Sequence, residues 1–148
     1  MRNAIIRRNT GETQICVSLE IDGKGKADLG DGTGIGFFDH MLNAFARHGL
    51  FDLDVEAKGD LEVDGHHLVE DTGIVMGEAI RQAAGDKAGI RRFGYFVLPM
   101  DEALVLCAVD LCGRPYFAMD FENGREGFSS PMVGEFDTQL VREFFYSV

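Results

Sequence analysis

Two kinds of hydrophobic pattern recur along the chain and predict its elements. Between residues 12 and 21, Ile15, Val17 and Leu19 alternate with more polar residues, which is typical of a half-buried strand. From Phe38, apolar residues recur at i, i+3, i+4 and i+7, which indicates an amphipathic helix. Together the patterns predict helices at residues 37–48, 66–84 and 135–146, and strands at 4–8, 12–21, shortly after 22–25, 51–57, 102–111 and 116–121. Loops are expected at 30–36, 89–94 and 122–131.

The predicted order suggests an internal duplication. Glu12 and Gly23 match Glu102 and Gly113 at one common offset, and Gly36-x-Phe38-Asp39 matches Gly134-x-Phe136-Asp137 at a slightly longer one. This predicts an α+β domain of two halves, residues 1–94 and 95–148, packed as one globular domain with the second half incomplete. Chance similarity between two amphipathic helices is the alternative explanation.

Composition narrows the possible partners. The net charge of −11 disfavours nucleic acid and anionic membrane surfaces, since both recruit basic patches. The three cysteines form no CxxC pair, and the polar N-terminal residues do not resemble a secretory signal, so we expect a cytoplasmic protein with reduced thiols. The most apolar stretch, near residues 104–109, is too short to span a bilayer. An anionic small substrate would need a local cluster of arginine or lysine residues.

The most informative segment is His66-His67-Leu68-Val69-Glu70-Asp71 at the start of the second predicted helix. Glu70 is four residues from His66 and three from His67, so it shares a helical face with either histidine and can join it at a metal ion. The histidines themselves diverge by about 100° around the helix axis. This geometry favours two metal ions, or one metal ion here and another shared with a different chain. Gly73 and Gly77 continue the Glu70 side and leave it open to close approach.

Other readings of this segment are possible. A helix start with exposed imidazoles would need no metal. An HxxEH metalloprotease motif is disfavoured, because Asp71 stands where that motif needs histidine. His40, at the edge of the first helix's apolar stripe, is a further candidate ligand or a boundary histidine. Loops containing Arg92 and Arg114 are candidates for an anion clamp, with ordinary surface arginine as the alternative.

These segments, in this order and spacing, resemble the imidazoleglycerol-phosphate dehydratase family. The resemblance runs through essentially the whole chain, with Cys112 where the family often has serine. The matching motifs are ET at 12–13, GIGFFDHML at 34–42, GHHLVED at 65–71, GIRRFG at 89–94, PMDEA at 99–103 and DLCGRP at 110–115.

The resemblance implies a fold of duplicated β-β-β-α-β-α halves, like domain 2 of ribosomal protein S5, with two sheets enclosing helices. It implies a lyase of histidine biosynthesis that dehydrates D-erythro-imidazole-glycerol phosphate to imidazole-acetol phosphate. It also implies two manganese ions per site, between the subunits of a large symmetric homo-oligomer. By motif position, the metal ligands would be His40, His66, His67 and Glu70, and the substrate-binding residues would be Glu12, Arg92, Asp101 and Arg114.

The implied chemistry suits these residue types. The leaving hydroxyl is not activated by a carbonyl, and two metals on the ring nitrogens would favour an imidazolate that could expel it. Either Glu70 or Glu12 could move the proton. Family members continue into a second His-His-x-x-Glu helix, so we expect this chain to be a truncated form of uncertain activity. A non-enzymatic metal-binding or assembly module and a di-metal phosphate-ester hydrolase are the competing hypotheses.

Overall fold

A computed structural model describes residues 1–121 and 127–148. Their contacts divide into two compact units, the first comprising Met1–Ala84 with Phe117–Val148 and the second Gly85–Tyr116. The elements of the first unit are β1 (Asn3–Asn9), β2 (Thr13–Glu20), β3 (Ala27–Asp28), α1 (Gly36–Gly49), β4 (Asp52–Gly59), α2 (His66–Ala84), β7 (Met132–Val133), β8 (Phe136–Asp137) and α3 (Gln139–Ser147).

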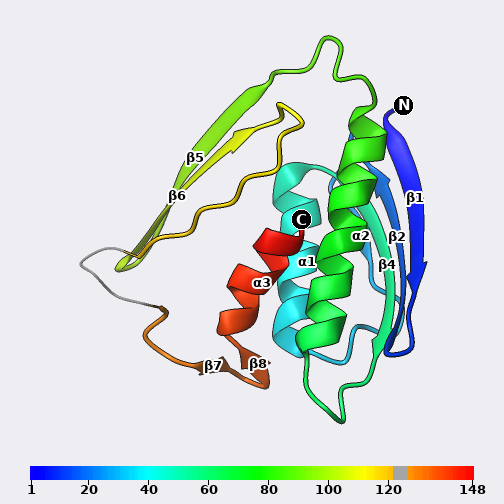
Figure 1. Cartoon of the computed structure of the whole chain (residues 1–148). Helices are drawn as coiled ribbons and strands as arrows, with labels where there is room; N and C mark the ends of the chain where they lie inside the picture. Colours follow the sequence, from blue (N-terminus) through cyan, green and yellow to red (C-terminus); the bar gives the residue numbers. More distant parts are fainter. Residues whose placement is uncertain (122–126) are drawn as a thin grey trace. The chain divides into compact units, whose positions relative to one another are not determined.

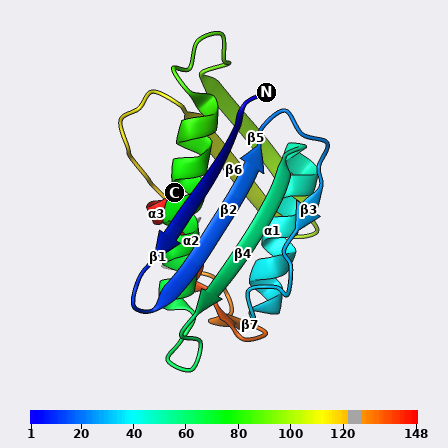
Figure 2. The same ribbon diagram turned by 90° about the vertical axis from the view of Figure 1, so that its right-hand side faces the viewer.

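A four-stranded sheet forms one layer of the first unit, with strand order β1-β2-β4-β3 (Figure 2). β1, β2 and β4 are antiparallel neighbours, and β3 pairs with β4 in parallel. The predicted alternation in β2 is confirmed, because Ile15, Val17 and Leu19 are all buried. Every second side chain of β2 and β4 thus enters the core, and the intervening ones remain outside.

Helices α1 and α2 cover the inner face of this sheet, and α3 lies against α2 on the side away from it (Figure 1). In α2 the predicted apolar side is confirmed, since Val69, Val75, Met76 and Ala79 are buried. In α1 the stripe is narrower than expected: Phe38 and Leu42 are buried, but Met41 and Phe45 are exposed. The order of the first six elements is the predicted β-β-β-α-β-α.

Two glycines of α2 allow α3 to approach closely. A Cβ atom at Gly73 would lie 2.8 Å from the backbone oxygen of Phe144 and 3.0 Å from Cβ of Ser147. A Cβ at Gly77 would collide with the backbone of Val148. The prediction that these glycines leave the Glu70 side of the helix open is therefore confirmed, and α3 is the element that occupies the space.

Two predictions for the later part of the chain are wrong, and one strand was not predicted. Residues 116–121 form no strand, whereas β5 (Phe93–Met100) was not foreseen. The last helix begins at Gln139 rather than at residue 135, because Gly134, with φ of 60°, turns the chain between β7 and β8. Phe136 is consequently a buried strand residue, although its predicted counterpart Phe38 is helical. Of the predicted loop at 122–131, residues 122–126 lie outside the described part. The internal duplication of residues 1–94 and 95–148 stays a prediction.

The second unit contains an antiparallel hairpin of β5 with β6 (Ala103–Asp110). Asp101 lies in its turn with φ of 49°, a left-handed conformation that aspartate tolerates better than most residues. The side chains of both strands are exposed within the chain.

We predict that Gly73→Ala destabilises the protein by about 1 kcal/mol, because overpacking against α3 outweighs the gain in helix propensity. Urea unfolding of the variant measures this. The matched control is Gly36→Ala in α1, where an added Cβ meets nothing within 4 Å. A Gly73→Ala variant as stable as the control would contradict the close packing of α3 on α2.

Candidate metal centre

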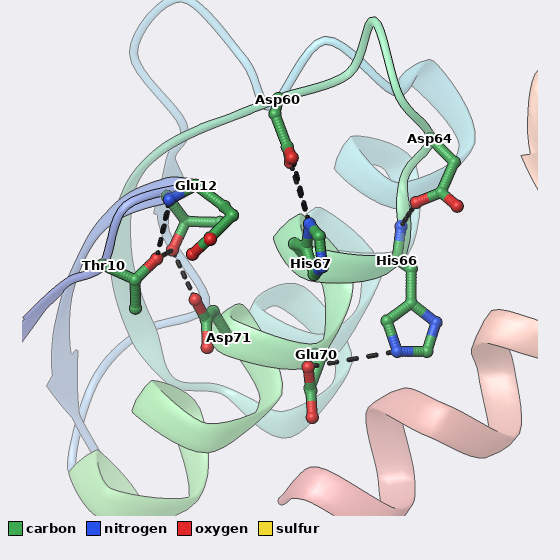
Figure 3. Close-up of polar contacts among 9 residues, drawn as sticks. Thr10, Glu12, Asp60, Asp64, His66, His67, Glu70 and Asp71 are labelled. Carbon is green, nitrogen blue, oxygen red and sulfur yellow. Dashed lines mark hydrogen bonds and ion pairs between the residues drawn. The ribbon is translucent and has the colours of Figure 1, made fainter.

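The His-His-x-x-Glu segment forms the first turn of α2. The Asp64 carboxylate accepts a hydrogen bond of 2.7 Å from the backbone N–H of His66, which satisfies one of the free amides at the helix start (Figure 3). The helix begins at His66, so both histidines and Glu70 are held on regular helical backbone. Their side chains are only partly buried and remain accessible to ligands.

The two adjacent histidines face different partners, as the helix geometry predicts. Their ring centroids are 6.1 Å apart and the rings are perpendicular. His66 faces Glu70, with 3.9 Å between Nε2 and Oε2. His67 points instead toward Asp60, which lies just beyond β4, with 3.0 Å between Nδ1 and Oδ2 (Figure 3). The two neighbouring imidazole rings therefore point to two different positions.

A third group joins His66 and Glu70 from α3. His66, Glu70 and Glu143 each place one ligand atom within 4.8 Å of the others, a spacing that can hold a metal ion. Glu143 was not among the residues predicted from the sequence. The residues around Glu143 in the sequence form no ligand pattern with it. Glu143 lies near Glu70 only because α3 packs on the face of α2 that carries Gly73 and Gly77. A pattern within one helix cannot show such a contact.

His67 lies in an acidic surrounding. Its hydrogen bond with Asp60 raises the pKa of His67 above the ordinary value, against a smaller opposing effect of desolvation. The negative charges of Asp60, Glu12 and Asp64 act in the same upward direction. Glu12 projects from the turn between β1 and β2 and lies beside His67 in Figure 3. The structure thus brings the sequence-predicted acid Glu12 to the predicted ligand His67.

His40 is not part of this donor group. It lies on the exposed side of α1, and within the described residues the group consists of His66, Glu70 and Glu143. Of the four predicted ligands, the structure thus gathers His66 and Glu70, places His67 alongside with a partner of its own, and leaves His40 outside.

The predicted substrate-binding residues Arg92, Asp101 and Arg114 all belong to the second unit. Arg92 makes a two-pronged ion pair with Asp110, with Nε to Oδ1 at 2.7 Å and Nη2 to Oδ2 at 3.1 Å. The pairing raises the pKa of Arg92 and lowers that of Asp110, and the charge of Arg114 adds to the lowering. The Arg92 guanidinium also lies over the ring of Phe93, 4.9 Å from its centroid.

Among the described residues, no helix combines the length and the apolar character that crossing a membrane requires.

Comparison with known proteins matches the motifs to one family. A sequence model of imidazoleglycerol-phosphate dehydratase matches residues 33–148. The dehydratase of Acetivibrio thermocellus is 58% identical over 143 residues, which are 97% of this chain and 70% of that protein. The dehydratase of Ruminiclostridium cellulolyticum is 57% identical over 148 residues, which are 100% of this chain and 73% of that protein.

Solved structures agree with the sequence comparison. The crystal structure of the Staphylococcus aureus dehydratase superposes with a TM-score of 0.82 at 36% identity, covering 98% of this chain and 75% of that one. The Pyrococcus furiosus enzyme gives 0.75 at 36% identity, covering 96% and 71%. The chain therefore belongs to the imidazoleglycerol-phosphate dehydratase family, lyases of histidine biosynthesis.

Proposed function

We propose that the chain dehydrates D-erythro-imidazole-glycerol phosphate to imidazole-acetol phosphate with the help of divalent metal ions, manganese being the ion that we expect. The observation that carries this proposal is the meeting of His66, Glu70 and Glu143 across two helices. Family membership alone names the reaction. The donor group supplies a physical reason for metal dependence.

The residues of this group suit a divalent cation. Imidazole nitrogen together with carboxylate oxygen is a donor set that first-row divalent ions accept. Glu70 and Glu143 bring two negative charges close together, and a cation between them would remove their mutual repulsion. Metal ions held there would supply the Lewis acidity that favours an anionic imidazole ring in the substrate.

His67 is prepared as a second ligand position. Its Nδ1 is engaged by Asp60, which leaves Nε2 as the atom free to bind a metal. Histidine ligands of metals characteristically use their other ring nitrogen in this way, and the carboxylate orients the ring and increases its basicity. Asp60 would thus hold His67 in the tautomer and rotamer that ligation needs.

The proposed division of roles between the two candidate bases follows from their positions. Glu70 belongs to the donor group, and a carboxylate that holds a metal is a poorer base than a free one. Glu12 lies outside that group, beside His67, so we assign the proton transfer to Glu12. His40, exposed on α1, would serve a site shared with a neighbouring subunit, as expected for a symmetric homo-oligomer.

Arg92, Arg114 and Asp101 are proposed to bind the substrate, with the two arginines on its phosphate. The guanidinium of Arg92 uses Nε and one Nη2 hydrogen on Asp110, which leaves N–H groups available to an anion. The ion pair also fixes the orientation of the guanidinium plane.

Turnover of imidazoleglycerol phosphate tests the function directly. We expect imidazole-acetol phosphate to form with manganese present and to stop when the metal is chelated, because the substrate ring then lacks its Lewis acid. Product formation unaffected by chelation would contradict the metal-dependent mechanism. Release of inorganic phosphate would favour the competing hydrolase hypothesis.

Substitution of the donor group tests the metal site. We expect Glu70→Gln and Glu143→Gln each to weaken manganese binding by more than roughly 100-fold. Loss of a residue that only orients a ligand costs roughly 10- to 100-fold in affinity, and loss of a ligand itself should cost more. Manganese titration followed by electron paramagnetic resonance measures the affinity. The matched control is Glu135→Gln, which removes an exposed acid outside the group. If Glu143→Gln binds manganese as the control does, α3 contributes no ligand.

The arginine assignment predicts a change in substrate requirement. Arg92→Ala and Arg114→Ala should raise KM by about 10- to 100-fold with a smaller change in kcat, because phosphate contacts persist from ground state to transition state. Arg81→Ala, which removes an exposed arginine paired with Glu78, is the control. Steady-state kinetics separates the two parameters, and an effect confined to kcat would assign the arginines to the chemical step instead.

A further inference from the structure

A buried carboxylate joins the sheet to the helix that carries the histidines. Asp71 follows Glu70 on α2 and is 5% exposed. Its Oδ1 accepts a hydrogen bond of 2.7 Å from Nε of Arg8 on β1, and its Oδ2 accepts a short one from the hydroxyl of Thr13 on β2. Both oxygens of Asp71 are thus held by the two strands that flank the Glu12 turn.

The turn itself is fixed by a second hydroxyl. Oγ1 of Thr10 accepts hydrogen bonds from the backbone N–H groups of Glu12, at 3.1 Å, and of Thr13, at 2.9 Å. It also lies 3.2 Å from Oγ1 of Thr13, the hydroxyl that donates to Asp71. The hydrogen bonds therefore run without a break from the backbone of Glu12 to the carboxylate of Asp71. Figure 3 shows Thr10, Glu12 and Asp71 gathered in this way.

Stability alone gives little reason for a charge at this position. Burying a carboxylate costs free energy that its ion pair and hydrogen bonds often only balance, and apolar residues of similar volume can serve a core equally well. A satisfied polar network does something that apolar packing does not, because it specifies one geometry. Here the geometry so specified is that of the turn from which the Glu12 side chain projects.

We propose that Thr10, Thr13 and Asp71, which we call the turn clamp, are positioning residues that hold the Glu12 carboxylate beside His67. The clamp acts through Glu12 and touches neither metal nor substrate. This inference rests on the proposed role of Glu12 in the reaction. It assigns a function to a network of hydrogen bonds that links the Glu12 turn to α2 at Asp71, four residues after His67.

Three substitutions test the clamp. Thr13→Val removes the donor to Asp71 and keeps the side-chain shape, whereas Thr13→Ser keeps the hydroxyl. The matched control is Thr72→Val. Thr72 lies on α2 and is buried like Thr13, but its hydroxyl donates to the backbone oxygen of Leu68, away from the turn. A merely structural hydroxyl would make Thr13→Val and Thr72→Val behave alike.

Amide hydrogen exchange at Glu12 reports on the turn without any need for activity. We expect Thr13→Val to accelerate exchange there by about tenfold or more relative to Thr72→Val, and Thr13→Ser to restore slow exchange. In turnover, Thr13→Val should lower kcat by about tenfold with manganese affinity unchanged, since only the proton-transferring group is displaced. Equal exchange at Glu12 in the Thr13→Val and Thr72→Val variants would overturn the clamp.

The Glu12→Gln background separates the clamp from the proposed function. If the clamp acts through Glu12, the loss of kcat caused by Thr13→Val disappears once Glu12 is already replaced. A loss of the same size in both backgrounds would overturn the clamp. If instead Glu12→Gln leaves kcat unchanged while Thr13→Val still accelerates exchange, the turn is clamped as inferred and the assignment of Glu12 as the base is wrong.

Discussion

The candidate metal centre depends on how closely α3 can approach α2. Helices with side chains at their contact are usually 8–10 Å apart. At Gly73 and Gly77 no side chain intervenes, so the backbone of α3 lies directly against α2. This approach carries Glu143 to Glu70. The aromatic contact between Phe38 and Phe144, with ring centroids 5.6 Å apart, secures α3 against α1 as well. The close packing at two glycines therefore determines that Glu143 lies near Glu70, one helical turn before Gly73.

Contacts between residues close in the sequence could be predicted, whereas contacts between distant elements could not. The spacing of His66 and Glu70 was enough to place them on one helical face, and the angle between consecutive residues was enough to separate His66 from His67. Glu143 required knowledge of how two distant helices dock, which no local pattern contains. The position of Asp60 beside His67 likewise depends on the path of the loop between β4 and α2.

The errors in secondary structure have equally specific causes. β5 has apolar residues on both of its faces and a proline near its end, so it lacks the alternation that identified β2. The helical pattern before Gln139 was misleading because Phe136 and Leu140 are both buried, one from a strand and the other from a helix. Residues 116–121 suggested a strand by composition, but a strand also needs a neighbour to pair with, and no described residue pairs with them in a sheet.

Part of the chain's negative charge is concentrated around the two histidines of α2. At the level of composition, a net charge of −11 only disfavoured polyanionic partners. In the first unit, acids surround the two histidines: Asp60 holds one ring, Glu70 and Glu143 face the other, and Glu12 projects nearby. Such a concentration of negative charge attracts a divalent cation and, without one, repels a phosphorylated substrate. Metal binding would therefore do two things at once, supplying Lewis acidity and removing the repulsion that an anionic substrate would otherwise meet. Under the proposed function, this coupling would favour binding of the cation before the phosphate ester.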